Sequence, residues 1–145
     1  MKWQQKYTIL ITEIISILFV LLFVYASASK LLGYQKFKVQ LIQSSLLSPY
    51  ANVIVWFIPV LELGIAILLL SKYKLLGLQL SLGLMTVFTI YIWYVLNYSP
   101  HIPCSCGGVI SSLNWTEHII FNLLWIFLAI IAIQINIRFK HTVQC

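Results

Sequence analysis

Four long apolar runs separated by short polar connections dominate the hydrophobic pattern of this chain. They cover residues 7–29, 50–70, 75–97 and 115–137. A helix needs about 20 mostly apolar residues to cross a hydrocarbon core about 30 Å thick. Each run therefore predicts a transmembrane helix. Together they predict an all-α fold, an integral membrane four-helix bundle that occupies residues 1–145 as a single domain.

The connection between the first two runs, residues 33–48, has a different pattern. Its apolar residues recur near one face at helical spacing, while lysines and glutamines occupy the other positions. This pattern predicts a short amphipathic helix on the membrane surface, between the first two spans. The alternative is a partly ordered loop with accidental periodicity. The apolar positions are Tyr34, Phe37, Leu41, Ile42, Leu46 and Leu47.

Composition excludes an ordinary water-soluble domain. The chain has 145 residues, of which 61% are hydrophobic and only 8% charged, whereas soluble domains carry about 25% charged residues. Lipid is therefore the expected surrounding. The net charge of +6 does not indicate nucleic-acid binding, because the basic residues gather at the ends of the apolar runs.

The distribution of these basic residues predicts the orientation of the helices. Six of them would fall on one side of the membrane, and residues 98–114 on the other side contain no Lys or Arg. By the positive-inside rule, both termini are cytoplasmic and residues 98–114 face outward. In a bacterium this describes a multi-pass protein of the inner (cytoplasmic) membrane with a periplasmic connection. The six are Lys2, Lys6, Lys72, Lys74, Arg138 and Lys140.

Small residues predict where helices approach closely. The segment Ala26-Ser27-Ala28 resembles a signal-peptidase site, but the run before it is long and contains Glu13. We interpret it as a packing patch between helices. Gly77, Ser81 and Gly83 predict similar close packing at the start of the third run.

Cys104-Ser105-Cys106 is the main candidate for chemistry. The two thiols lie in a connection rich in Pro and Gly, between the third and fourth runs. A disulfide in so small a ring is strained, and strained exposed disulfides are oxidising and labile. We expect thiol–disulfide exchange through a mixed disulfide. Cys145 would lie about 30 Å away, at the other end of the fourth span, and is not expected to take part.

Two alternatives remain open for this pair. The first is a purely structural disulfide. The second is a copper or zinc site that His101, Cys104 and Cys106 would form with His118, since soft thiolate and imidazole ligands suit these metals. A second paired element typical of zinc sites is missing, so we predict no metal site. Instead, His101 and His118 are expected to be interfacial residues or bases that tune the thiols.

Buried acidic residues need partners, because a charge at the centre of a membrane costs at least about 2.5 kcal/mol. Glu62 lies inside the second run, and Lys30 at the end of the first is its candidate partner. Glu62 is either a structural polar tie or a participant in proton or quinone chemistry. The sequence thus assigns no cofactor with certainty and leaves quinone possible.

Short motifs in a consistent order resemble a known family. Ser29-Lys30-Leu31-Leu32-Gly33 and residues 59–64, PVLELG, resemble DoxX-like membrane proteins. Residues 102–108, IPCSCGG, followed by LNWTEH at 113–118 and Asn122, are similar to the redox-associated MauE branch, the methylamine-utilisation proteins.

The resemblance implies a four-helix membrane bundle that works with a periplasmic thioredoxin-like partner in forming or maintaining disulfides of exported proteins. It also implies that Cys104 and Cys106 are the redox pair, and that Lys30 and Glu62 are polar positions of the bundle. The chain lacks the second outward cysteine pair of quinone-coupled disulfide-forming enzymes. Thiol–disulfide oxidoreductase activity is thus the leading hypothesis, and the alternatives are a non-enzymatic membrane subunit and a copper- or zinc-binding membrane protein.

Overall fold

The computed structural model describes residues 2–98 and 115–144. All regular structure in these residues is helical. The elements are α1 (Lys2–Leu32), α2 (Tyr34–Gln43), the 3₁₀ turn η1 (Ser48–Tyr50), α3 (Ala51–Leu70), α4 (Lys74–Tyr98) and α5 (Trp115–Gln144).

The predicted all-α membrane fold is confirmed. Within residues 2–98 and 115–144, four helices are long and apolar enough to cross a membrane, and they correspond to α1, η1 with α3, α4 and α5. Many of their large apolar side chains face outward. Val53, Ile67 and Leu70 of α3, for example, are each more than 65% exposed. In a bilayer these side chains contact lipid, so their exposure carries no hydrophobic cost.

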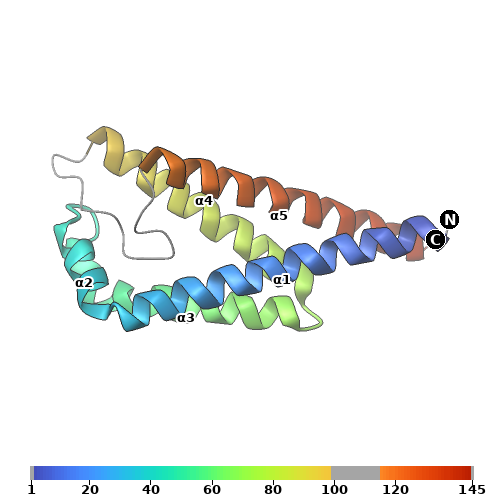
Figure 1. Ribbon diagram of the computed structural model, residues 1–145, viewed down its shortest axis with the longest axis horizontal. Helices are drawn as coiled ribbons and strands as arrows, with labels where there is room; N and C mark the ends of the chain where they lie inside the picture. Colours follow the sequence, from blue (N-terminus) through green and yellow to red (C-terminus); the bar gives the residue numbers. More distant parts are fainter. Residues whose placement is uncertain (1, 99–114, 145) are drawn as a thin grey trace.

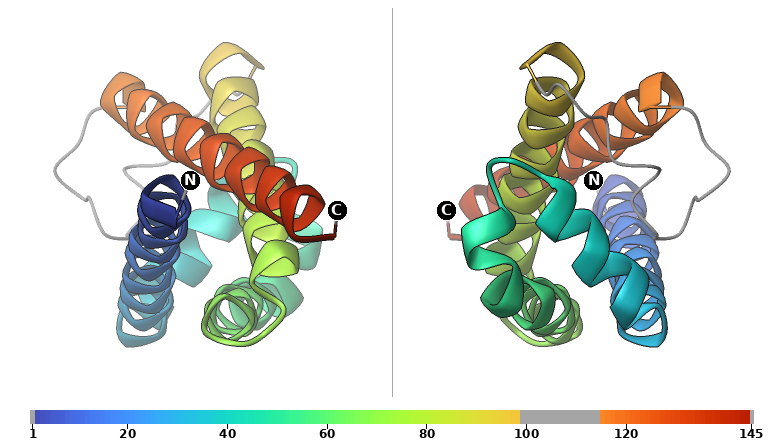
Figure 2. Two further views of the ribbon diagram at one scale, coloured as in Figure 1. Left: turned by 90° about the vertical axis from the view of Figure 1, so that its right-hand side faces the viewer. Right: turned by 90° about the vertical axis from the view of Figure 1, so that its left-hand side faces the viewer.

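The long helices form two closely packed pairs. α1 packs most extensively against α3, and α4 against α5. The members of each pair run antiparallel, and the two pairs lie on opposite sides of the molecule (Figure 1). α3 also contacts α4 across the short turn at residues 71–73, and α1 contacts α5. Seen along the length of the molecule, the four long helices are inclined to one another, and α4 and α5 diverge from α1 and α3 toward the end where α2 lies (Figure 2).

The interior of the bundle is aromatic and aliphatic. Phe19 and Phe23 of α1 are almost completely buried, together with Leu69 of α3 and Leu78 of α4. The ring of Phe19 meets Trp125 of α5 edge-on, with centroids 4.8 Å apart, a favourable geometry for aromatic pairs. This contact joins the two helix pairs near the middle of the molecule.

Small residues bring α3 and α4 together. A Cβ added to Gly77 would lie 3.0 Å from the backbone nitrogen of Leu69, so a larger residue there would force the two helices slightly apart. Ser27 and Ser81 are fully buried, as the packing interpretation predicted. For Gly83 that interpretation was wrong: no described atom lies within 4 Å of a Cβ added there, because its face of α4 is turned outward.

α2 lies across one end of the bundle, beside α1 and α3 (Figure 2). Phe37 and Leu41 of α2 pack against Ala51 and Val55 of α3, while Ile42 is half exposed. The helix expected between the first two spans thus exists in the structure. Its position on the membrane surface stays a prediction.

The helix ends gather in the way that the lysine and arginine pattern requires. The start of α1, the α3–α4 turn and the end of α5 lie at one end of the molecule, which we call the turn end (Figure 1). α2, the end of α4 and the start of α5 lie at the other, which we call the α2 end. That the turn end faces the cytoplasm stays a prediction from the positive-inside rule.

Candidate functional site

An ion pair is buried near the α2 end. Lys30, in the last turn of α1, places its Nζ 2.7 Å from Oε1 of Glu62 on α3. Only 14% of the lysine side chain and 2% of the glutamate side chain are exposed. The pairing proposed from the sequence is confirmed. Because each charge offsets the other, both can remain in an apolar bundle.

Neighbouring groups fix the position of Lys30. Its Nζ also lies 3.5 Å from the carbonyl oxygen of Ala26 and 5.9 Å from the ring centroid of Phe88 on α4. An ammonium group over an aromatic face is electrostatically favourable. Lys30 therefore connects α1 to α3 by an ion pair and to α4 by a cation–π contact.

A second polar contact holds α1 against α3 one turn deeper. The buried Ser27 hydroxyl donates a hydrogen bond to the carbonyl oxygen of Pro59, at 3.1 Å. Glu62 follows Pro59 by three residues, about one helical turn, so the two contacts lie on one face of α3. The small side chain of Ser27 permits this close approach.

Several buried polar atoms retain hydrogen-bonding capacity. Within the described residues, Oε2 of Glu62, Nδ2 of Asn122 and Nε1 of Trp125 have no protein partner. Asn122 and Trp125 both lie on α5, and a spacing of three residues places them on one face. Trp125 could not be singled out from the sequence, because one indole in an apolar run gives no polar signal.

His118 lies near the start of α5 and is half buried. The start of α5 lies at the α2 end, which also holds the Lys30–Glu62 pair. Its expected role, as an interfacial residue or as a base that tunes the thiols, stays a prediction.

The other predicted site residues, His101, Cys104 and Cys106, lie outside the described residues. The chain reaches them from Tyr98 at the end of α4 and returns at Trp115 at the start of α5. Across residues 2–98 and 115–144, no three His, Cys, Asp or Glu side chains gather to hold a metal ion. The alternative metal site built on Cys104 and Cys106 is outside that search.

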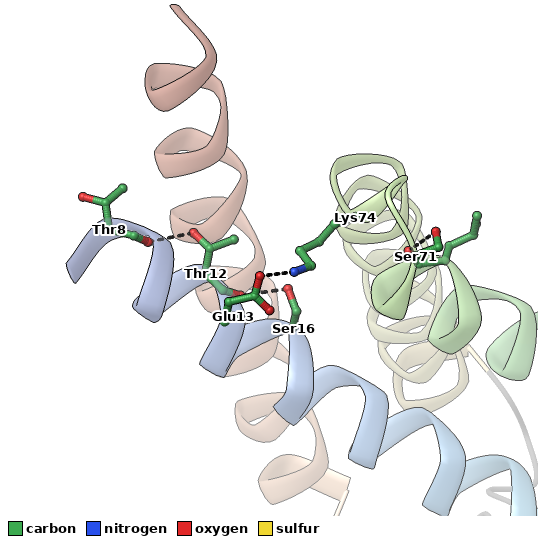
Figure 3. A network of polar contacts seen from close by, with 7 residues as sticks. Thr8, Thr12, Glu13, Ser16, Ser71 and Lys74 are labelled. Carbon is green, nitrogen blue, oxygen red and sulfur yellow. Dashed lines mark hydrogen bonds and ion pairs between the residues drawn. The ribbon is translucent and has the colours of Figure 1, made fainter. Parts of the chain in front are cut away.

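The turn end contains a polar cluster that the sequence analysis missed. Glu13 of α1 forms an ion pair with Lys74, the first residue of α4 (Figure 3). The Thr12 hydroxyl donates to the carbonyl oxygen of Thr8 at 3.2 Å, and Ser16 donates to that of Thr12 at 2.8 Å. The sequence shows Glu13 only as an interruption of an apolar run, since the helix register that brings Lys74 to it is a tertiary property.

Comparison with known proteins gives one family. Residues 8–135 match the family model described as "Methylamine utilisation protein MauE". This range includes all of α3 and α4, most of α1 and α5, Lys30, Glu62 and both cysteines of the Cys-Ser-Cys segment. Neither the curated proteins nor the solved structures provide a match. The wider resemblance to DoxX-like proteins stays a prediction.

Proposed function

Because the chain belongs to the MauE family of methylamine-utilisation proteins, we propose that it is a membrane thiol–disulfide redox protein that works through Cys104 and Cys106. The observation that carries this proposal is the Cys-Ser-Cys segment between two membrane-spanning helices. An ordinary helical bundle has no need of two thiols so close together. A strained disulfide between them would be readily reduced, which suits exchange better than structural support.

The position of this segment in the chain supports the proposal. Residues 99–114 connect the end of α4 to the start of α5, at the end of the molecule that also holds the Lys30–Glu62 pair. The N-terminus of α5 carries a partial positive charge, which favours a thiolate nearby. His118, in the first turns of α5, is a candidate base that tunes the thiols.

The exchange proceeds in two balanced steps. A thiolate of a reduced partner attacks one sulfur of the Cys104–Cys106 disulfide, so that a mixed disulfide forms and the other cysteine leaves as a thiolate. The second thiol of the partner, once deprotonated, then attacks the mixed disulfide. The partner is oxidised to a disulfide, and Cys104 and Cys106 are reduced by the same two electrons. The reverse sequence would reduce the partner instead.

The partner and the compartment follow from the same argument. Exchange of this kind requires a dithiol protein, and we propose a thioredoxin-like protein of the periplasm that serves exported proteins. Disulfides persist in that compartment, and the positive-inside rule directs residues 98–114 toward it. Lys30 and Glu62 act as positioning residues that hold α1, α3 and α4 together at the α2 end.

Trapping tests the proposal directly. In Cys106→Ser, an attack on or by Cys104 cannot be resolved within the protein, so a mixed disulfide with a periplasmic protein accumulates. We expect a band on a non-reducing gel that dithiothreitol removes, and mass spectrometry of that band identifies the partner. All variants are made in a Cys145→Ser background, so that the terminal cysteine cannot form the adduct.

Two controls make the trapping result decisive. The double variant Cys104→Ser with Cys106→Ser should give no adduct. Labelling intact cells with a membrane-impermeant thiol reagent after mild reduction should modify Cys104 and Cys106 in the wild-type protein. If both cysteines are labelled but no adduct forms in Cys106→Ser or in Cys104→Ser, the pair does not exchange with a protein partner. If neither cysteine labels, the periplasmic site is wrong.

A further inference from the structure

A polar cavity opens at the turn end, at the opposite end of the molecule from the Lys30–Glu62 pair. Its volume is about 320 Å³, and α1, the α3–α4 turn and α5 all contribute to its wall. Its polar lining residues are Thr8, Thr12, Glu13, Ser71, Lys72, Lys74 and Asn136. We call it the turn-end cavity. Glu13, Ser71 and Lys74 are among the residues drawn in Figure 3.

The cavity results from a difference in helix length. Glu13 is paired with Lys74, so it lies level with the start of α4. α1 continues beyond this level to Lys2, which corresponds to about 16 Å at 1.5 Å per residue. α5 also extends past the α3–α4 turn (Figure 1). The short turn therefore leaves a step between the two longer helices, and the cavity lies at this step.

The charge of the cavity is positive. The Glu13–Lys74 ion pair is neutral as a unit. Lys72 adds a further positive charge; its Nζ lies 5.3 Å from the ring centroid of Tyr73. Within the described residues Lys72 has no carboxylate partner. A ligand with a single negative charge would balance the cavity.

The remaining hydrogen-bond donors point to a phosphate. The Ser71 hydroxyl donates to the carbonyl oxygen of Leu68 at 2.8 Å and accepts from the backbone N–H of Tyr73 at 3.1 Å. The Thr12 hydroxyl donates to Thr8. Since these hydroxyl protons are already used, the ammonium groups and the amide of Asn136 remain as donors. Ammonium groups bind phosphate through charge-assisted hydrogen bonds.

The apolar part of the wall indicates where the phosphate comes from. Ile9 and Ile135 line the cavity beside its charged groups. Exposed apolar side chains continue along α1 toward the middle of the span, among them Ile14, Ile17 and Leu21. A lipid could place its headgroup in the cavity and lay an acyl chain along this surface. A soluble phosphate ion would gain no binding free energy from this apolar surface.

We propose that the turn-end cavity binds the phosphodiester of an anionic glycerophospholipid from the leaflet at this end of the molecule. The phosphate accepts from Lys72, Lys74 and Asn136, and a headgroup hydroxyl donates to the Glu13 carboxylate. Anionic lipids such as phosphatidylglycerol carry the required single charge. Phosphatidylcholine has no net charge and no headgroup hydroxyl. The site is independent of the cysteine chemistry.

Native mass spectrometry of the full chain in detergent tests this site. The protein is titrated with dioleoyl phosphatidylglycerol, with dioleoyl phosphatidylcholine, and with inorganic phosphate as a competitor. We expect preferential retention of one phosphatidylglycerol molecule. Because a lysine near an anionic lipid contributes on the order of fivefold in affinity, Lys72→Gln should weaken retention by about fivefold.

The matched controls separate this site from general lipid attraction. Lys36→Gln removes an exposed lysine from the opposite end and should leave retention unchanged. Lys72→Arg keeps the charge and should preserve retention. Equal retention of both lipids, or no loss in Lys72→Gln, would overturn the proposal. Displacement of the lipid by millimolar inorganic phosphate would also overturn it, since the site would then belong to a soluble anion.

Discussion

α1 carries two ion pairs, Glu13–Lys74 in its first half and Lys30–Glu62 in its last turn, and the two pairs differ in their surroundings. Lys30–Glu62 is sealed among α1, α3 and α4, and the Glu62 side chain is only 2% exposed. Glu13–Lys74 borders an open cavity, with the Glu13 side chain 48% exposed. Seventeen residues separate Glu13 from Lys30, which is about 25 Å along the helix.

The difference shows what each pair does for the protein. A charge without a partner is costly in the apolar interior, so neither Lys30 nor Glu62 can be lost alone. At the turn end, water and headgroups can solvate Glu13 or Lys74 by itself, and an exposed ion pair contributes little. At the α2 end, the helices are therefore held together by a polar contact that cannot lose one partner. At the turn end they are held together by close packing, and the charges of Glu13 and Lys74 are left available to a ligand.

Removal of one partner of the buried pair should have the largest effect. Lys30→Ala leaves the Glu62 carboxylate uncompensated, and we expect a loss of about 3–5 kcal/mol in the free energy of unfolding. Unfolding in detergent, followed by circular dichroism, measures this loss. The apolar double variant Lys30→Met with Glu62→Leu should recover most of it. If Lys30→Ala unfolds like the wild type, the pair is not a structural requirement.

Two glycine variants test whether close packing of α3 against α4 stabilises the turn end. In Gly77→Ala the new Cβ would meet the backbone of Leu69 at 3.0 Å, so α3 and α4 must separate, at a cost of about 1–3 kcal/mol. Gly83→Ala is the matched control, because its Cβ meets no described atom, and its stability should remain within about 1 kcal/mol of the wild type. The same unfolding experiment compares them. Equal effects would argue against close packing as the main contact of this end.

The smallest effect is expected for the exposed pair. Glu13→Gln should change the free energy of unfolding by less than about 1 kcal/mol. The change should shrink further at about 1 M salt, where exposed charges are screened. Thermal unfolding at low and high salt measures both. A loss as large as that of Lys30→Ala would remove the distinction between the two ends.

Much of this fold could be predicted from the sequence because lipid imposes a simple rule. A spanning helix must be long and apolar, so the apolar runs at residues 50–70 and 75–97 directly predicted α3 and α4. The Lys30–Glu62 contact was predictable for a related reason: a buried carboxylate needs a cation, and few basic residues lie outside the turn end. Both arguments depend on composition and position along the chain.

Features that depend on helix register could not be predicted. Gly77 and Gly83 look alike in the sequence, but only Gly77 faces a neighbouring helix. Lys74 was interpreted only as an orientation signal, and its contact with Glu13 requires knowing how α1 lies against the α3–α4 turn. Cys104 and Cys106 stand apart from both groups. Their pairing and role are proposals that rest on sequence and family.

The unequal lengths of the helices also determine how this protein fits a membrane. With 20 residues, α3 extends about 30 Å, close to the thickness of a typical hydrocarbon core. α1 and α5, with 31 and 30 residues, are long enough to emerge from it. Hydrophobic mismatch therefore acts first on α3, the shortest of the four spanning helices. In a thicker bilayer the turn after α3 would be drawn below the headgroups, whereas α1 and α5 would still reach water.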